Sequence, residues 1–153
     1  MLIIMISGRA GAGKSSFSQF CMKHLESIKQ ESILVPFARG VKRAAKDSFG
    51  WDGNKDKAGR RLLQRIGLLG REYNENIWAD QATKTIDQVW VVGSETVFID
   101  DWRFPNEGKV ISDKYDYVLK IRIIRPEEYL TLFNTTLYDD ISETSLSDSL
   151  GYD

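Results

Sequence analysis

An apolar run, Leu2-Ile3-Ile4-Met5-Ile6, leads directly into the segment Gly8-Arg9-Ala10-Gly11-Ala12-Gly13-Lys14-Ser15. This segment matches the pattern G-x-x-x-x-G-K-[S/T], in which glycines let the backbone turn tightly and aim its N–H groups at an anion. Apolar side chains at spacings of three and four then predict a helix from Lys14 to about Lys29, whose positive end favours the same anion. A buried strand, a glycine-rich turn and a helix in this order predict a phosphate-binding site.

The pattern assigns a role to each position of this phosphate loop. Lys14 can reach the β- and γ-phosphates of ATP, and the Ser15 hydroxyl can ligate Mg²⁺. We expect the ATP phosphates to be bound by eight residues in all: Gly8, Ala10, Gly11, Ala12, Gly13, Lys14, Ser15 and Ser16.

Composition excludes several other classes of protein. The 153 residues are 42% hydrophobic and 28% charged, which disfavours disorder and a membrane protein. With one cysteine and one histidine, the chain can form neither an internal disulfide nor a multi-cysteine zinc site. We expect residues 1–153 to form a single cytoplasmic domain, in the cytoplasm of the host cell if the protein is viral.

The remaining pattern alternates strands with helices. Residues 32–38, 96–101 and 117–124 are typical of strands, and residues 41–49, 56–73, 76–89 and 105–114 of helices. Helical crossovers between strands predict an α/β protein with a mainly parallel sheet, the three-layer fold of P-loop NTPases. Since no apolar run follows Leu150, the sequence also predicts this fold without its last strand and helix.

An apolar strand that ends in acids, Val97-Phe98-Ile99-Asp100-Asp101, supplies the expected partner of the phosphate loop. Such an acid holds the Mg²⁺ shell in P-loop NTPases. Periodicity leaves open whether Asp100 or Asp101 faces the metal. Two arginines at strand ends, Arg103 and Arg125, are candidates for stabilising a transferring phosphoryl group.

The middle of the chain is strongly basic: residues 39–71 carry ten Lys or Arg and three acids. On a helix over residues 56–73, one face holds Arg60, Gln64, Gly67 and Arg71. Arginine forks suit phosphate and glutamine suits a base edge, so this face is a candidate acceptor site. The opposite side, with Leu62, Ile66, Leu69 and Tyr73, is predicted to face the core. An ordinary solvated helix face is the alternative.

Four stretches in order resemble the bacteriophage-type deoxynucleoside monophosphate kinases of the P-loop nucleoside monophosphate kinase group. The first is the phosphate loop, and the second is Phe37-Ala38 through Lys42 with Phe49-Gly50-Trp51. The third is Gly59-Arg60-Arg61-Leu62-Leu63-Gln64 with Gly70-Arg71 and Trp78. The fourth, Asp101-Trp102-Arg103-Phe104-Pro105-Asn106-Glu107, is far more specific than the loop alone.

The resemblance implies transfer of a phosphoryl group from ATP to a deoxynucleoside monophosphate, with Mg²⁺. It implies a helical monophosphate-binding region at 39–90 and a lid-like region at 126–147. Lys42, Arg60, Gln64, Arg71, Trp78 and Arg103 would bind the acceptor, and Lys14, Arg103, Arg125 and Asp101 would act in catalysis.

Other hypotheses stay open at this stage. They are a P-loop kinase of another small metabolite, and a nucleotide-binding module that has lost turnover. Nucleic-acid binding through the basic middle is disfavoured, because the motif carries a mechanism and a charge patch does not. Small-molecule nucleotides are the expected partners, no membrane is expected, and a homodimer is left open.

Overall fold

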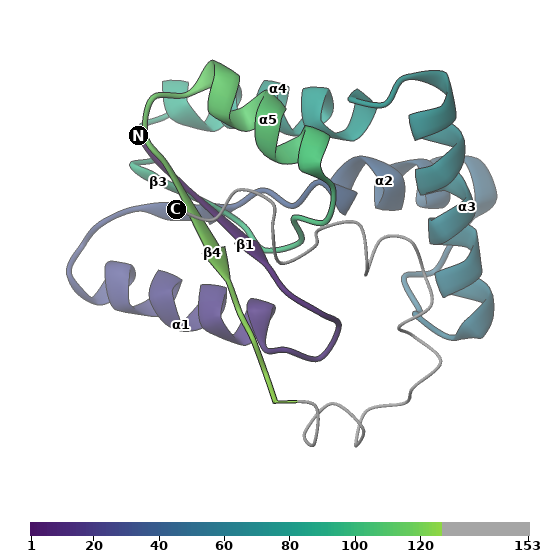
Figure 1. The fold of residues 1–153 in the computed structure, drawn as a ribbon, viewed down its shortest axis with the longest axis horizontal. Helices are drawn as coiled ribbons and strands as arrows, with labels where there is room; N and C mark the ends of the chain where they lie inside the picture. The colour runs from purple at the N-terminus through teal and green to yellow at the C-terminus, as the bar shows by residue number, and fades with distance from the viewer. Residues whose placement is uncertain (127–153) are drawn as a thin grey trace.

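Four parallel strands form the centre of the computed structural model, which describes residues 1–126 (Figure 1). They are β1 (Leu2–Ser7), β2 (Ser32–Leu34), β3 (Thr96–Ile99) and β4 (Val118–Arg122), in the sheet order β2-β3-β1-β4. Met5 of β1 is in register with Ile99 of β3 on one side and with Lys120 of β4 on the other. The carboxyl ends of β1 and β3 therefore lie side by side.

Five helices surround this sheet in the described part of the chain. They are α1 (Lys14–Ser27), α2 (Ala38–Phe49), α3 (Lys57–Tyr73), α4 (Ile77–Val91) and α5 (Pro105–Lys114). Helix α1 covers one face of the sheet, and α4 and α5 cover the other (Figure 1). The predicted α/β class with a parallel sheet in three layers is confirmed.

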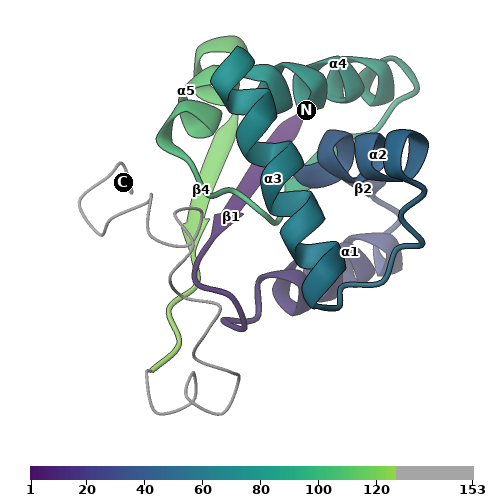
Figure 2. The same ribbon diagram turned by 90° about the vertical axis from the view of Figure 1, so that its right-hand side faces the viewer.

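Helices α2 and α3 lie beyond the carboxyl ends of the strands rather than over the sheet (Figure 2). Open parallel sheets bind ligands at this edge. The core lies on the α4–α5 face, where Ile3, Met5, Ile99, Ile86 and Ile111 are each fully buried.

Local chemistry explains where several elements begin. The Asp56 carboxylate accepts a hydrogen bond from the Gly59 N–H at 2.7 Å and caps α3. Pro105 occupies the first turn of α5, where its missing N–H would have no helical partner.

The second strand is shorter than predicted, and the helix after it begins earlier. β2 ends at Leu34 and α2 starts at Ala38, whereas the sequence pattern predicted strand up to residue 38 and helix from residue 41. Pro36 has no N–H to give to a ladder, and the N–H groups of Phe37 and Ala38 donate to Asp101 instead.

Two expectations concern residues that the structure does not describe. The predicted lid-like region and the absence of a fifth strand both fall on residues 127–153, outside the described part of the chain. Within residues 1–126, no helix is both long enough and apolar enough to cross a membrane.

Candidate nucleotide-binding site

The phosphate loop connects β1 to α1 at the carboxyl edge of the sheet. Gly8 and Gly13 have positive φ angles of 137° and 103°, a conformation that L side chains rarely adopt. A Cβ atom at Gly8 would also collide with the carbonyl group of Ile123 just after β4. Two independent constraints therefore require glycine at this position.

Lys14 folds back over the loop that precedes it. Its Nζ donates to the carbonyl oxygens of Gly8 at 2.6 Å and of Arg9 at 2.9 Å. Arg125, after β4, reaches the same loop, where Nη1 donates to the Gly11 carbonyl at 3.1 Å. The fold thus brings two cations that are 111 residues apart in sequence to one loop.

The two acids after β3 have different surroundings. Both carboxylate oxygens of Asp101 accept backbone hydrogen bonds at the start of α2, from Phe37 and Ala38, each at 2.9 Å. Burial raises the pKa of Asp101, and these two hydrogen bonds oppose the shift. Asp101 therefore fixes the start of α2 through both of its carboxylate oxygens.

Asp100 faces α1 instead. It is buried, and the Ser18 hydroxyl donates to its Oδ2 at 3.4 Å while also donating to the Ser15 carbonyl at 3.1 Å. Asp100 is thus the acid that lies behind the phosphate loop.

Residues 1–126 contain no group of three or more His, Cys, Asp or Glu that could hold a metal ion. Ser15 and Asp100 are suited to a Mg²⁺ that takes most of its ligands from phosphate oxygens and water. The residues present therefore fit the Mg²⁺ that the phosphate loop implies.

Four cations from four segments meet at the same edge and form what we call the basic cluster: Lys42, Lys55, Arg60 and Arg103. Partial burial lowers the pKa of Lys55, and the nearby charges of Lys42, Arg60 and Arg103 lower it further. Asp100 acts in the opposite direction on the pKa of Lys55, so this acid lies near the basic cluster as well as behind the phosphate loop. Like charges held together in this way create a strong field for an anion.

Arg71 lies beside this cluster on an aromatic support. Its guanidinium carbon is 4.2 Å from the centre of the Phe104 ring. The segment that carries Arg103 and Phe104 is held by Glu107, whose Oε2 accepts from both of their N–H groups at 3.0 Å. Burial raises the pKa of Glu107 to about 7, and the nearby charge of Arg71 opposes the shift.

The predicted acceptor residues are only partly brought together. Arg60 joins the basic cluster and also donates from Nε to the Lys55 carbonyl at 2.8 Å. Gln64 is exposed on α3, and its side chain makes no hydrogen bond to any described residue. Trp78 is buried: its Nε1 donates to the Gly67 carbonyl at 3.0 Å, and its ring packs against Gly70. Trp78 therefore joins α3 to α4.

The prediction for the core side of α3 is wrong for Leu69 and Tyr73, whereas Leu62 and Ile66 are half-buried. Leu69 is 66% exposed and Tyr73 is 87% exposed, whereas Gly59 and Gly67 are buried. Helix α3 packs against α2 and α4 rather than over the sheet. Glycines let the large side chains of neighbouring elements approach it, so hydrophobic periodicity within α3 did not identify the buried side.

Sequence reasoning missed Lys55, Ser18 and Glu107. Lys55 lies in a turn inside the basic stretch, where only its place in the tertiary structure distinguishes it from its neighbours. Ser18 had a usable signal, since it lies one helical turn after Lys14 on the same face of α1. Glu107 also had one, because an acid in the first turn of a helix that starts with proline is typical of an N-terminal cap.

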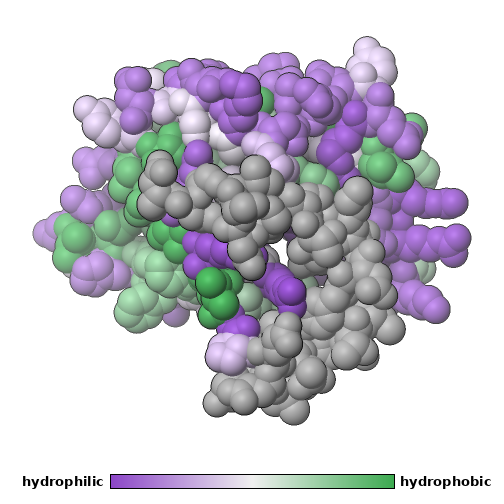
Figure 3. Space-filling view, viewed as in Figure 1, coloured by the Kyte–Doolittle hydropathy of each residue, from purple (hydrophilic) through white to green (hydrophobic). Residues whose placement is uncertain are grey.

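Polar and apolar side chains gather on different parts of the surface. Hydrophilic side chains lie over much of α4 and α5, and hydrophobic side chains gather toward α1 and β4 (Figure 3). Phe20 on α1 is 73% exposed and Tyr117 before β4 is 70% exposed.

Comparisons with known proteins find partial similarities to this chain. No protein-family model matches the chain. The uncharacterized protein ORF77 of Ictalurid herpesvirus 1 (strain Auburn) is 34% identical over 110 residues, which are 71% of this chain and 45% of that protein. The match therefore spans less than half of the relative's length.

Among solved structures, the Cys556Ala mutant of the Mycobacterium tuberculosis APS kinase CysC is similar with a TM-score of 0.39 and 13% identity. That likeness covers 82% of this chain and 80% of the kinase.

Proposed function

We propose that this protein transfers a phosphoryl group from ATP to a nucleoside monophosphate, with a deoxynucleoside monophosphate as the expected acceptor. One observation carries the proposal: Asp100 contacts Ser18 behind the phosphate loop and also lies near Lys55 of the basic cluster, so the two regions share the carboxyl edge of the sheet. The loop is suited to the β- and γ-phosphates of a donor. A second concentration of positive charge beside it suits the phosphate of an acceptor.

In this proposal the chain mainly positions two anions and neutralises the charge between them, which is most of what phosphoryl transfer requires of a protein. The loop N–H groups and Lys14 hold the donor phosphates, and Lys42, Arg60, Arg71 and Arg103 hold the acceptor phosphate. Arg125, already at the loop carbonyl of Gly11, supplies further charge on the donor side. When bound, Mg²⁺ would neutralise charge on the donor phosphates, with Ser15 and Asp100 among its ligands.

The base of the acceptor would lie near Phe104, because this aromatic ring is next to Arg103 of the basic cluster and beneath the Arg71 guanidinium. Gln64 is close in sequence on the same helix and would contact a base edge. We do not place Trp78 at the base, since its indole N–H already donates to Gly67.

Variants of the two acids after β3 test which acid binds the metal and which one stabilises the fold. We expect Asp100→Asn to reduce transfer strongly while leaving the unfolding midpoint nearly unchanged. Asp101→Asn should instead lower the free energy of unfolding by about 1–3 kcal/mol, because it weakens two buried hydrogen bonds to α2. Thermal unfolding and single-turnover rates of both variants test this assignment. Comparable destabilisation in both variants would contradict it.

The direct test is a panel of acceptors with ATP and Mg²⁺. dTMP, dGMP, dCMP, dAMP and the corresponding ribonucleotides are each incubated with the full chain, and ADP and diphosphate formation are measured. Turnover with at least one monophosphate, absent in Lys14→Ala, is the expected result. ATP hydrolysis without a diphosphate product would instead indicate a nucleotide-binding module, and phosphorylation of other metabolites only would indicate a different kinase.

A further inference from the structure

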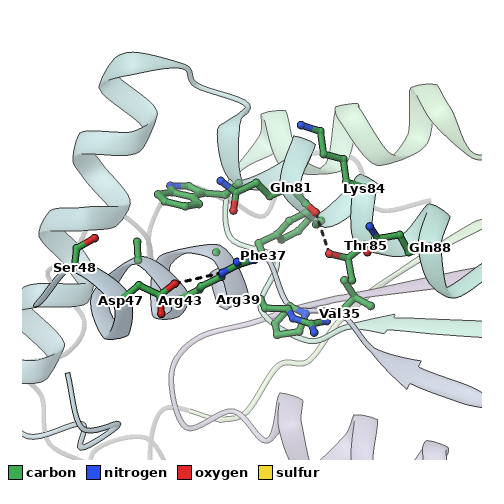
Figure 4. A pocket seen from close by; sticks show the side chains of 15 residues that line it. Val35, Phe37, Arg39, Arg43, Asp47, Ser48, Gln81, Lys84, Thr85 and Gln88 are labelled. Carbon is green, nitrogen blue, oxygen red and sulfur yellow. Dashed lines mark hydrogen bonds and ion pairs between the residues drawn. The ribbon is translucent and has the colours of Figure 1, made fainter. Parts of the chain in front are cut away.

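A second groove opens between α2 and α4, and neither the phosphate loop nor the basic cluster borders it (Figure 4). Its volume is about 510 Å³, within the range usual for small-molecule sites. Helix α2 contributes Arg39, Arg43 and Asp47 to its walls, and α4 contributes Gln81, Lys84 and Gln88.

The rim of this groove carries an excess of positive charge. Arg39 and Arg43 lie one turn apart on α2, and Lys84 lies on α4. Asp47 pairs with Arg43, whose Nε is 3.4 Å from Oδ2. Neither Arg39 nor Lys84 forms an ion pair with any described residue. Arg39 and Lys84 thus place one cation on each wall of the groove (Figure 4).

The interior of the groove has a different character. Buried Val35, Phe37 and Ala82 form an apolar floor. Two amide side chains, Gln81 and Gln88, come from the α4 wall (Figure 4), and the Gln81 amide oxygen reaches across to Gly40 of α2. An apolar floor with a few polar groups and a charged rim is typical of a site for an organic anion.

We propose that this groove binds a nucleotide. Its phosphates would contact Arg39, Arg43 and Lys84, and its base would lie toward the floor with the two amides at its edge. An amide offers both a donor and an acceptor, as a base edge requires.

The groove is linked to the candidate active site through α2. Lys42 of the basic cluster lies roughly 150° around α2 from the centre of the groove face. The first turn of α2 is held by Asp101, next to Asp100. On α4, Trp78 lines the groove and also donates to Gly67, one turn before Arg71. A nucleotide bound between α2 and α4 would therefore alter the position of acceptor-binding residues. This regulatory part of the inference rests on the proposed function.

Binding is tested by calorimetric titration of the full chain with each of the four deoxynucleoside triphosphates and with inorganic tripolyphosphate. We expect at least one nucleotide to bind at two sites. Arg39→Glu/Lys84→Glu should weaken one of them by at least about tenfold, as expected when charged contacts to a phosphate are reversed. Lys14→Ala should weaken only the other. The matched control, Lys23→Glu/Arg65→Glu, changes two exposed cations elsewhere by the same charge and should change neither site.

The outcomes separate the two proposals. If no nucleotide loses a binding event in Arg39→Glu/Lys84→Glu, the groove site does not exist, whatever the transferase activity. If tripolyphosphate binds the groove as tightly as the nucleotide does, the assignment to a nucleotide is wrong, because the apolar floor and the two amides then add nothing to the affinity. If the groove binds but no monophosphate is phosphorylated, the proposed function fails and the binding site stands. The regulatory role is supported if the groove nucleotide changes the KM for the acceptor in wild type but not in Arg39→Glu/Lys84→Glu.

Discussion

The phosphate loop and the basic cluster both concentrate positive charge at the carboxyl edge of the sheet, but they are built differently. The loop is one contiguous segment, Gly8–Ser15, whose geometry comes from glycine backbone angles and a lysine that bonds to its own loop. The basic cluster takes Lys42 from α2, Lys55 from a turn, Arg60 from α3 and Arg103 from the segment after β3.

This difference determines how each region responds to mutation. The loop positions its groups through local backbone geometry. A mutation there should therefore reduce phosphoryl transfer while leaving the structure outside the loop unchanged. The basic cluster depends on α2 and α3 being held beyond the carboxyl edge of the sheet, through their packing on each other and on α4. Mutations that change packing at Trp78 or Glu107 should therefore also weaken binding of the acceptor phosphate, although neither residue touches a substrate phosphate in the proposed mechanism.

The largest effect is expected at Lys14. Lys14→Ala removes the point charge on the transferring phosphoryl group and should reduce kcat by on the order of a thousandfold. Its hydrogen bonds to the Gly8 and Arg9 carbonyls are partly exposed, so the free energy of unfolding should fall by no more than about 1–3 kcal/mol. Steady-state rates and a denaturation curve check both parts, with Lys23→Ala on the same helix as the control. A wild-type rate would contradict the loop assignment.

Arg71→Lys addresses the acceptor side. Lysine keeps the charge but loses the planar fork that matches a phosphate. The KM for the monophosphate should rise far more than the KM for ATP, and kcat should fall by up to about a hundredfold if the acceptor is displaced by about 1 Å. Arg65→Lys on the exposed side of α3 is the control.

Kinetics with both substrates varied separate the two sides of the site. A change confined to the KM for ATP would place Arg71 on the donor side and would remove the distinction between the two regions.

Glu107 provides a test of how the cluster is held, through pH. Its pKa is raised from 4.5 to about 7 in the folded chain, so the folded state binds this proton more tightly than the unfolded state. Its contribution to stability is therefore largest below pH 4.5 and is lost as the pH rises to about 7, by up to roughly 3 kcal/mol.

Glu107→Gln removes this dependence while preserving the cap. Both backbone N–H groups donate to the same oxygen, Oε2, so an amide oxygen can replace it. Relative to the variant, wild type should lose stability between pH 5 and pH 8, as measured by urea unfolding at the two pH values. Parallel pH profiles for the two proteins would show that Glu107 does not titrate in this range.

The smallest effect is expected from packing at Gly70. A Cβ atom there would overlap the rigid indole of Trp78, so Gly70→Ala should destabilise the fold by about 1–3 kcal/mol despite the better helix propensity of alanine. The KM for the acceptor should rise as well, because Arg71 follows directly in the chain. Chemical denaturation and acceptor kinetics measure the two effects.

Gly40→Ala is a matched control on α2. Its Cβ would meet the end of the flexible Gln81 side chain, which can move aside, and would lie 3.0 Å from the Trp78 ring, farther from the indole than a Cβ at Gly70. Equal destabilisation by the two variants would show that the indole contact is not the constraint.

The strand–loop–helix unit could be predicted from sequence alone, because each of its parts is local. An apolar run predicts a buried strand, the glycines predict the turn, and the spacing of apolar residues predicts α1. The parallel sheet followed from the alternation of elements for the same reason. Arg103 and Arg125 could be placed near the site because strand ends in a parallel sheet share one edge.

Only the tertiary structure decided which side of α3 is buried and which acid lies behind the loop. Periodicity failed for α3 because its contacts are made by glycines that receive Trp51 and Trp78 from other segments. The choice between Asp100 and Asp101 depended on the N–H groups of Phe37 and Ala38, more than 60 residues away in the chain. Side-chain patterns within one element predict that element's own geometry, whereas a partner brought from elsewhere leaves no periodic signal in the sequence.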